Sequence, residues 1–140
     1  MPSSDQNMAA QCLTHPAGQL AIVDLTGQTR RDITYGALTE MADGLARALM
    51  ARVQVGDRVG VLLSQSPWCA AAHIAIWKIG AISVPLFKLF KYDALQSRVG
   101  DAGIEIVLTD DEGAGLLGDL AEPWRADTAG ITGGVVEMTA

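Results

Sequence analysis

Three glycines late in the chain have the spacing of a phosphate-binding turn. Gly113, Gly115 and Gly118 form a G-x-G-x-x-G pattern between an expected strand and an expected helix. Such glycines let a backbone turn tightly and approach a pyrophosphate, and Glu137 stands near the distance expected of a ribose-binding acid. We favour a flexible glycine-rich loop without a ligand, because three acidic residues come directly before the glycines and would repel a pyrophosphate.

The acidic run Asp110, Asp111 and Glu112 follows an expected strand directly. Doubly wound sheets bind ligands at the carboxyl ends of their strands, where carboxylates can hold Mg²⁺ as they do in receiver domains. A receiver site also needs an acceptor aspartate after an earlier strand and a late lysine, whereas Ser64 stands at that strand end and the tail has no lysine. We therefore expect a solvated helix start that the helix dipole stabilises.

Cys69 and His73 lie one helical turn apart and could form half of a metal site. The other candidates for a second pair are Cys12 and His15, far away in the sequence. Core packing of the thiol and the imidazole is therefore the expectation. The sequence contains neither a G-x-S-x-G nucleophile motif nor a G-x-x-x-x-G-K-[ST] phosphate loop, so these residue types alone give no complete site.

The composition predicts one folded domain with an acidic C-terminal part. The chain has 140 residues, of which 49% are hydrophobic, and a formal net charge of −6. Residues 1–100 carry nine basic and seven acidic side chains, whereas residues 101–140 carry one and nine. Nucleic-acid binding and basic anchoring to a membrane both need a positive face and are therefore not expected. Two isolated cysteines and a start without the pattern of a signal peptide favour the cytoplasm.

Apolar patterns predict the elements that would position these residues. A β-hairpin is expected over residues 20–35, and an amphipathic helix from 35 to about 52. Beyond them, apolar runs predict strands at 58–63, 81–87 and 104–109, with helices at 66–79, which Ser66 would cap, and at 93–102. A further helix is expected to end before Pro123. Alternating strands and helices predict an α/β fold with a doubly wound, mostly parallel, flavodoxin-like sheet and no membrane span.

Six segments in unbroken order share the sequence pattern of one enzyme family: 33–38 (ITYGAL), 55–63 (VGDRVGVLL), 65–67 (QSP), 72–87 (AHIAIWKIGAISVPLF), 93–95 (DAL) and 107–110 (VLTD). They resemble the opening part of the adenylate-forming acyl-CoA synthetases, and residues 72–87 are most similar to the medium-chain and acetate-like members. The resemblance covers about residues 18–112. It implies an N-terminal segment at 1–17, an α/β subdomain at 18–122 and a Gly/Ala-rich tail at 123–140.

The resemblance also implies a function for a longer enzyme. Members of this family adenylate a carboxylate with ATP and Mg²⁺ and pass the acyl group to coenzyme A. Their phosphate loop, ribose-binding aspartate and catalytic lysine have no counterpart among these residues, so we expect the chain alone to bind none of these cofactors and to be inactive.

One binding segment is carried over from the resemblance. In acetate-like members, the segment after the V-P strand lines the entrance for the nucleotide end of coenzyme A, and it maps onto Phe87, Lys88 and Leu89. Small residues or glycine are common there, so this chain departs from the family pattern. Lys88 and Lys91 would suit the phosphates of coenzyme A, and a surface loop with two solvated lysines is the alternative.

Residues 86–90 (LFKLF) are expected to expose apolar side chains. We expect either the remainder of a synthetase or a second copy of the chain to cover Phe87, Leu89 and Phe90. A non-catalytic interaction module and a dinucleotide-binding domain remain as alternatives to a synthetase.

Overall fold

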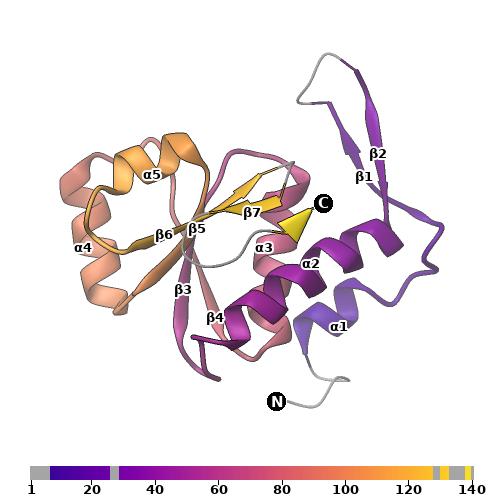
Figure 1. Cartoon of the computed structure of the whole chain (residues 1–140), viewed down its shortest axis with the longest axis horizontal. Helices are drawn as coiled ribbons and strands as arrows, with labels where there is room; N and C mark the ends of the chain where they lie inside the picture. The colour runs from indigo at the N-terminus through magenta and orange to yellow at the C-terminus, as the bar shows by residue number, and fades with distance from the viewer. Residues whose placement is uncertain (1–6, 26–28, 128–129, 133–137, 140) are drawn as a thin grey trace.

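The computed structural model describes residues 7–25, 29–127, 130–132 and 138–139. A six-stranded sheet runs through it in the order β4-β3-β5-β6-β7-β8 (Figure 1). Its first four strands are parallel: β3 (Arg58–Leu62), β4 (Ile82–Pro85), β5 (Ile106–Thr109) and β6 (Glu122–Asp127). Two antiparallel strands extend it: β7 (Gly130–Thr132) and β8 (Met138–Thr139). A separate antiparallel hairpin consists of β1 (Leu20–Asp24) and β2 (Arg31–Thr34), as predicted.

Helices cover both faces of the sheet. In Figure 1, one side carries α1 (Met8–Cys12), α2 (Tyr35–Met50) and α3 (Pro67–Lys78), and the other carries α4 (Tyr92–Ala102) and α5 (Asp111–Leu117). Each side has its own core, a larger one beneath α1–α3 and a smaller one beneath α4 and α5. Numbered from β3, the parallel strands have the order 2-1-3-4, which is that of flavodoxin-like sheets. The predicted doubly wound α/β class is confirmed.

The central strands are buried because helices pack on both of their faces. On β3, Val59 and Val61 point into the larger core, whereas Leu62 belongs to the smaller one. On β5, Leu108 belongs to the larger core and Val107 to the smaller one. Apolar runs without alternation are the sequence signature of such strands.

The helix ends follow local chemistry, with one correction. The Thr34 hydroxyl accepts a hydrogen bond from the backbone N–H of Ala37 at 3.2 Å and so caps α2. Pro67 starts α3, and its missing N–H costs nothing there. Ser66 occupies the cap position as predicted, but its side chain makes no capping hydrogen bond.

The prediction of a flexible glycine-rich loop followed by a helix is wrong. Gly113 and Gly115 lie inside the helix α5, and Gly118 ends it with a positive φ of 59°. Residues 118–121 form a turn rather than a helix, and Pro123 lies in strand β6. The sheet tolerates that proline because β7 pairs with β6 only from Arg125 onward. Glu137 lies outside the described residues.

Four of the described elements fall in regions for which the sequence predicted no structure: α1, β6, β7 and β8. Strand β6 starts at Glu122 and continues the parallel sheet into the expected tail, with Trp124 and Ala126 buried. Helix α1 lies in the N-terminal segment, where the Asn7 side chain caps it by accepting from Ala9 N at 2.8 Å. The Asn7 amide also donates to the Trp77 carbonyl and so ties α1 to α3. No helix in the described part of the chain is long and apolar enough to cross a membrane.

Candidate functional site

The strand order creates one position where a doubly wound sheet can hold a ligand. Neighbouring strands β3 and β5 are followed by helices on opposite faces, α3 and α5, so their chains separate beyond the carboxyl ends. A crevice at such a switch point is the general ligand position in these folds. Ser64 follows β3 there, Asp110 follows β5, and the loop after adjacent β4 brings Lys88.

Four side chains meet at this position, and we call Ser64, Lys88, Asp110 and Glu112 the carboxyl-edge cluster. The Lys88 ammonium donates to Ser64 Oγ at 2.6 Å, to Asp110 Oδ2 at 2.7 Å and to Glu112 Oε2 at 3.2 Å. The Ser64 backbone N–H also donates to Asp110 Oδ2 at 3.4 Å. The charged side chains at this switch point are therefore paired with one another.

Partial burial and pairing set the protonation of the cluster. The side chains of Lys88 and Asp110 are only 16% and 24% exposed. Burial acts to lower the pKa of Lys88, but hydrogen bonds to Asp110 and Glu112 outweigh it and raise that pKa above its ordinary value. Burial acts to raise the pKa of Asp110, but hydrogen bonds from Lys88 and from the Gly113 and Ser64 amides lower it overall. Both groups are firmly charged near neutral pH.

Gly113 is needed for packing at this edge rather than for a phosphate. The Gly113 N–H donates to Asp110 Oδ1 at 2.9 Å, so Asp110 caps α5. A Cβ at Gly113 would lie 2.7 Å from the Leu62 carbonyl oxygen and still closer to Thr109 Oγ1. That hydroxyl is buried and donates to the Leu62 carbonyl at 2.7 Å. The glycine lets α5 start directly against β3 and β5.

The three acidic residues diverge instead of forming one acidic site. Asp110 and Glu112 pair with Lys88, whereas exposed Asp111 pairs with Arg125 Nε at 2.8 Å. Among the residues that the structure describes, no group of three or more histidine, cysteine or acidic side chains is placed to hold a metal ion. The lysine ammonium takes the place that a cation would need.

The segment carried over from the family resemblance lies beside the cluster. Phe87 is 59% exposed and Leu89 is 96% exposed, so both side chains face solvent. The Phe87 ring meets the Phe90 ring edge-on, with 5.3 Å between centroids. Lys88 points the other way and is engaged by carboxylates, which distinguishes it from the solvated lysine of a surface loop.

Cys69 and His73 line a separate hollow, whose wall includes Gln65 and Ser66 directly after Ser64 of the carboxyl-edge cluster. It has a volume of about 450 Å³, and its walls come from β1, from the residues before α3 and from α3 itself: Ile22, Val23, Asp24, Leu25, Gln65, Ser66, Pro67, Cys69, Ala70 and His73. Burial raises the pKa of Cys69 and lowers that of His73, so both are neutral at pH 7. His73 packs against Trp77 with 5.9 Å between ring centroids. These contacts agree with the predicted packing role.

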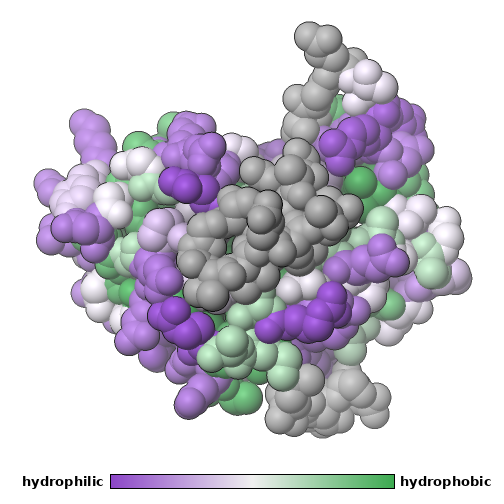
Figure 2. All heavy atoms as spheres, viewed as in Figure 1, coloured by the Kyte–Doolittle hydropathy of each residue, from purple (hydrophilic) through white to green (hydrophobic). Residues whose placement is uncertain are grey.

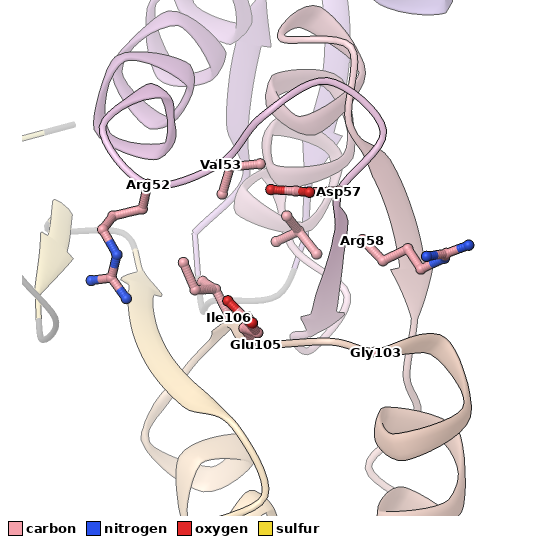
Figure 3. A pocket seen from close by; sticks show the side chains of 8 residues that line it. Arg52, Val53, Asp57, Arg58, Gly103, Glu105 and Ile106 are labelled. Carbon is pink, nitrogen blue, oxygen red and sulfur yellow. The ribbon is translucent and has the colours of Figure 1, made fainter.

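A small polar cavity of about 120 Å³ lies at the opposite, amino-terminal edge of the sheet, beside β3 and β5. Its walls include Arg52, Arg58, Asp57 and Glu105, so the charges balance. In Figure 3 the two guanidinium groups point away from each other, and Arg52 is paired with Glu122 at 2.8 Å. Drug-sized ligands need cavities of at least about 300 Å³, and no charge of one sign converges here. The carboxyl edge remains the stronger candidate.

Comparison with known proteins places this architecture in a family. Residues 8–136 match the family model described as "AMP-binding enzyme". The chain belongs to the AMP-binding enzyme family. It is 42% identical over 97 residues to an acetyl-coenzyme A synthetase of Halorhodospira halophila, covering 69% of this chain and 15% of that protein. A second acetyl-coenzyme A synthetase, from Novosphingobium aromaticivorans, is 37% identical over 129 residues, covering 86% of this chain and 20% of that protein.

The fold leads to the same family. The crystal structure of a Brucella canis acyl-CoA synthetase superimposes with a TM-score of 0.80 at 25% identity, covering 85% of this chain and 23% of that chain. The parallel sheet is that of the N-terminal subdomain of adenylate-forming enzymes. This member of the AMP-binding family thus spans 15% to 20% of the length of these two curated relatives.

The sequence analysis placed the residues of the cluster near strand ends, but it did not predict that their side chains contact one another. Ser64, Lys88 and Asp110 each come directly after a predicted strand (58–63, 81–87 and 104–109), and these positions are the signal that the sequence offers. Placing them together requires the strand order, because the neighbours β3 and β5 are separated in sequence by α3, β4 and α4.

Proposed function

We propose that the chain is the N-terminal part of an AMP-forming acyl-CoA synthetase. In the proposed reaction, a carboxylate oxygen attacks the α-phosphorus of ATP and pyrophosphate leaves. The thiol of coenzyme A then attacks the acyl carbon, loses its proton, and displaces AMP. The observation that carries the proposal is that residues 8–136 match the AMP-binding family, while 85% of the chain superimposes on an acyl-CoA synthetase.

These residues alone do not fit the nucleotide or its metal, and ATP and Mg²⁺ would be held elsewhere in the longer enzyme. The sequence lacks a Ser/Thr/Gly-rich loop that ends in lysine. The carboxylates of Asp110 and Glu112 are neutralised by Lys88, and Asp111 pairs with Arg125. Stabilising charge during adenylation requires groups preorganised around the phosphates. We therefore propose that the chain by itself forms no acyl-adenylate.

Within the longer enzyme, we propose that Phe87, Lys88 and Leu89 border the entrance for coenzyme A. Two observations support this: the segment lies at the carboxyl edge of the sheet, and Phe87 and Leu89 face solvent. Their exposure also supports contact with the remainder of the synthetase. The free thiols Cys12 and Cys69 support a reducing, cytoplasmic location.

A non-catalytic interaction module is the second candidate, and the same exposure favours it. Leu89 is almost wholly exposed, beside an exposed Phe87. On the face in view in Figure 2, however, hydrophilic and apolar residues are interspersed along the α4 and α5 side. A mixed surface of this kind supports weak association rather than a tight dimer.

The first experiment measures carboxylate-dependent exchange of labelled pyrophosphate into ATP, with acetate, butyrate and octanoate as substrates. The chain alone should give no signal above a blank without protein. A chimera in which residues 8–127 replace the matched part of the H. halophila acetyl-coenzyme A synthetase should restore exchange. A chimera that folds, by its melting transition, and still shows no exchange would refute the proposed function.

The second experiment separates the entrance from the adenylation step. Pyrophosphate exchange needs no coenzyme A, so a substitution at the entrance should act on the second half-reaction only. In the chimera, Leu89→Asp should raise KM for coenzyme A about tenfold and leave exchange unchanged. Val55→Asp is the matched control, because Val55 is also exposed but lies just before β3, at the opposite edge. Equal KM values for the two variants would rule out the entrance assignment.

A further inference from the structure

The segment after β4 alternates between anchored and displayed side chains. Leu86 is buried, Lys88 is 16% exposed and Phe90 is half-buried, whereas Phe87 and Leu89 face solvent. Two backbone hydrogen bonds also fix this segment: Leu86 N donates to the Val61 carbonyl at 2.8 Å, and Phe90 N donates to the Phe87 carbonyl at 3.0 Å. The displayed side chains are thus oriented by the residues between them.

Lys88 is the anchor that reaches other parts of the fold. Its ammonium donates to Ser64 after β3, to Asp110 after β5 and to Glu112 in α5. Phe90 anchors the opposite end against α4, where the Arg98 guanidinium lies 4.4 Å from the ring centroid. Among the hydrogen bonds of the described residues, those of Lys88 are the side-chain ones that join this turn to the ends of β3 and β5.

We propose that Lys88 is a positioning residue that holds Phe87 and Leu89 in the orientation in which they meet a ligand at the carboxyl edge. The proposal rests on the proposed function, because the ligand it concerns is coenzyme A. It changes the role expected of this lysine, which acts through the neighbouring side chains instead of binding a phosphate itself.

The charges around Lys88 argue against direct phosphate binding. The cluster holds one ammonium and two carboxylates within hydrogen-bond distance of it, so its net charge is negative. A phosphate that approached Lys88 would meet Asp110 and Glu112 and would have to replace them as acceptors. Exposed Lys91, three residues further on, has no such carboxylate among the ion pairs of the described residues.

The test uses the 140-residue chain and nuclear magnetic resonance. Backbone order parameters of residues 87–91 are measured for the wild type, Lys88→Met, Lys88→Arg and the control Lys91→Met, together with the ¹³C titration of the Asp110 carboxyl group. Rigid backbone gives order parameters near 0.85, and flexible backbone gives values below about 0.6. We expect Lys88→Met to become flexible at 87–91 and to raise the pKa of Asp110, while Lys88→Arg and Lys91→Met remain like the wild type.

The outcomes separate this proposal from the proposed function. A folded Lys88→Met chain with a rigid 87–91 segment, or equal loosening in Lys91→Met, would overturn the positioning role. If Lys88→Met does not fold, Glu112→Gln is the second variant, since Glu112 is largely exposed and should loosen the segment without unfolding the chain. In the active chimera, Lys88→Met should raise KM for coenzyme A. An inactive chimera would refute the proposed function and leave the resonance result to decide the role of Lys88.

Discussion

Replacing Gly113 with alanine tests the packing of α5 against the strand ends. The new Cβ would lie 2.7 Å from the Leu62 carbonyl oxygen and closer to Thr109 Oγ1, and neither is the end of a flexible side chain. Overpacking of this kind costs about 1–3 kcal/mol. Displacing Thr109 also breaks its buried hydrogen bond to Leu62, which costs about 1–3 kcal/mol more. A gain in helix propensity of about 1 kcal/mol opposes these losses.

We therefore expect Gly113→Ala to lower the free energy of unfolding by about 1–5 kcal/mol. Urea denaturation followed by the fluorescence of the buried Trp68 and Trp124 measures it. Gly115→Ala is the matched control, because Gly115 lies in the same helix and its Cβ would meet no atom within 4 Å. That control should be neutral or stabilised by up to about 1 kcal/mol.

The pair of substitutions gives a clear refutation. If Gly113→Ala is as stable as Gly115→Ala, then the close approach of α5 to Leu62 and Thr109 is not a feature of the folded chain. Thr109→Ala provides a further check, since it removes the nearest atom and its hydrogen bond. The double variant Thr109→Ala/Gly113→Ala should then lose less stability than the two single variants together.

Three further predictions concern charge, ligands and association. Because Asp110 has a lowered pKa in the folded chain, its contribution to stability is present above about pH 4 and is lost as the pH falls through the folded pKa. Asp110→Asn should cost about 1–3 kcal/mol at pH 7 and show a weaker acid dependence in urea titrations. Calorimetry should detect no NAD binding, and a micromolar site that Gly115→Val abolishes would contradict this. Sedimentation should show micromolar or weaker self-association that Leu89→Ser reduces, because Leu89 is 96% exposed; a strictly monomeric chain that binds no hydrophobic dye would contradict it.

The sequence was most informative where apolar patterns were long. The runs that became β3 and β5 and the helical spacing of α2 predicted elements within a few residues of those observed. Strand β6 was missed because its alternating pattern is short. Trp124 and Ala126 are buried on either side of exposed Arg125, and the preceding Pro123 suggested only the end of a helix. The glycines of α5 suggested a loop because a close approach to Leu62 and Thr109 is a tertiary requirement that local propensity does not contain.

At the candidate site, too, some features could be predicted from the sequence and others depend on the tertiary structure. Strand-end positions of Ser64, Lys88 and Asp110 follow from the apolar runs, and their residue types suggested charge chemistry. The pairing of Lys88 with Asp110 depends on the strand order, in which β4 and β5 both lie beside β3, and local sequence patterns do not contain that order. The family resemblance directed attention to residues 87–89 without revealing that Lys88 turns inward.

Because the two cores differ in size, we expect the layer formed by α4 and α5 to be the first to undergo subglobal unfolding. Fewer buried side chains hold this layer to the sheet than hold α1–α3. Regions with little buried apolar surface open at a lower free energy than the whole domain. Glu112 belongs to α5 and Asp110 caps it, so the contacts of the carboxyl-edge cluster should break when α5 unfolds. A molecule that binds at this edge only when α4 and α5 are folded would raise the free energy of their local unfolding. Its affinity is thereby coupled to the local folding equilibrium of these two helices.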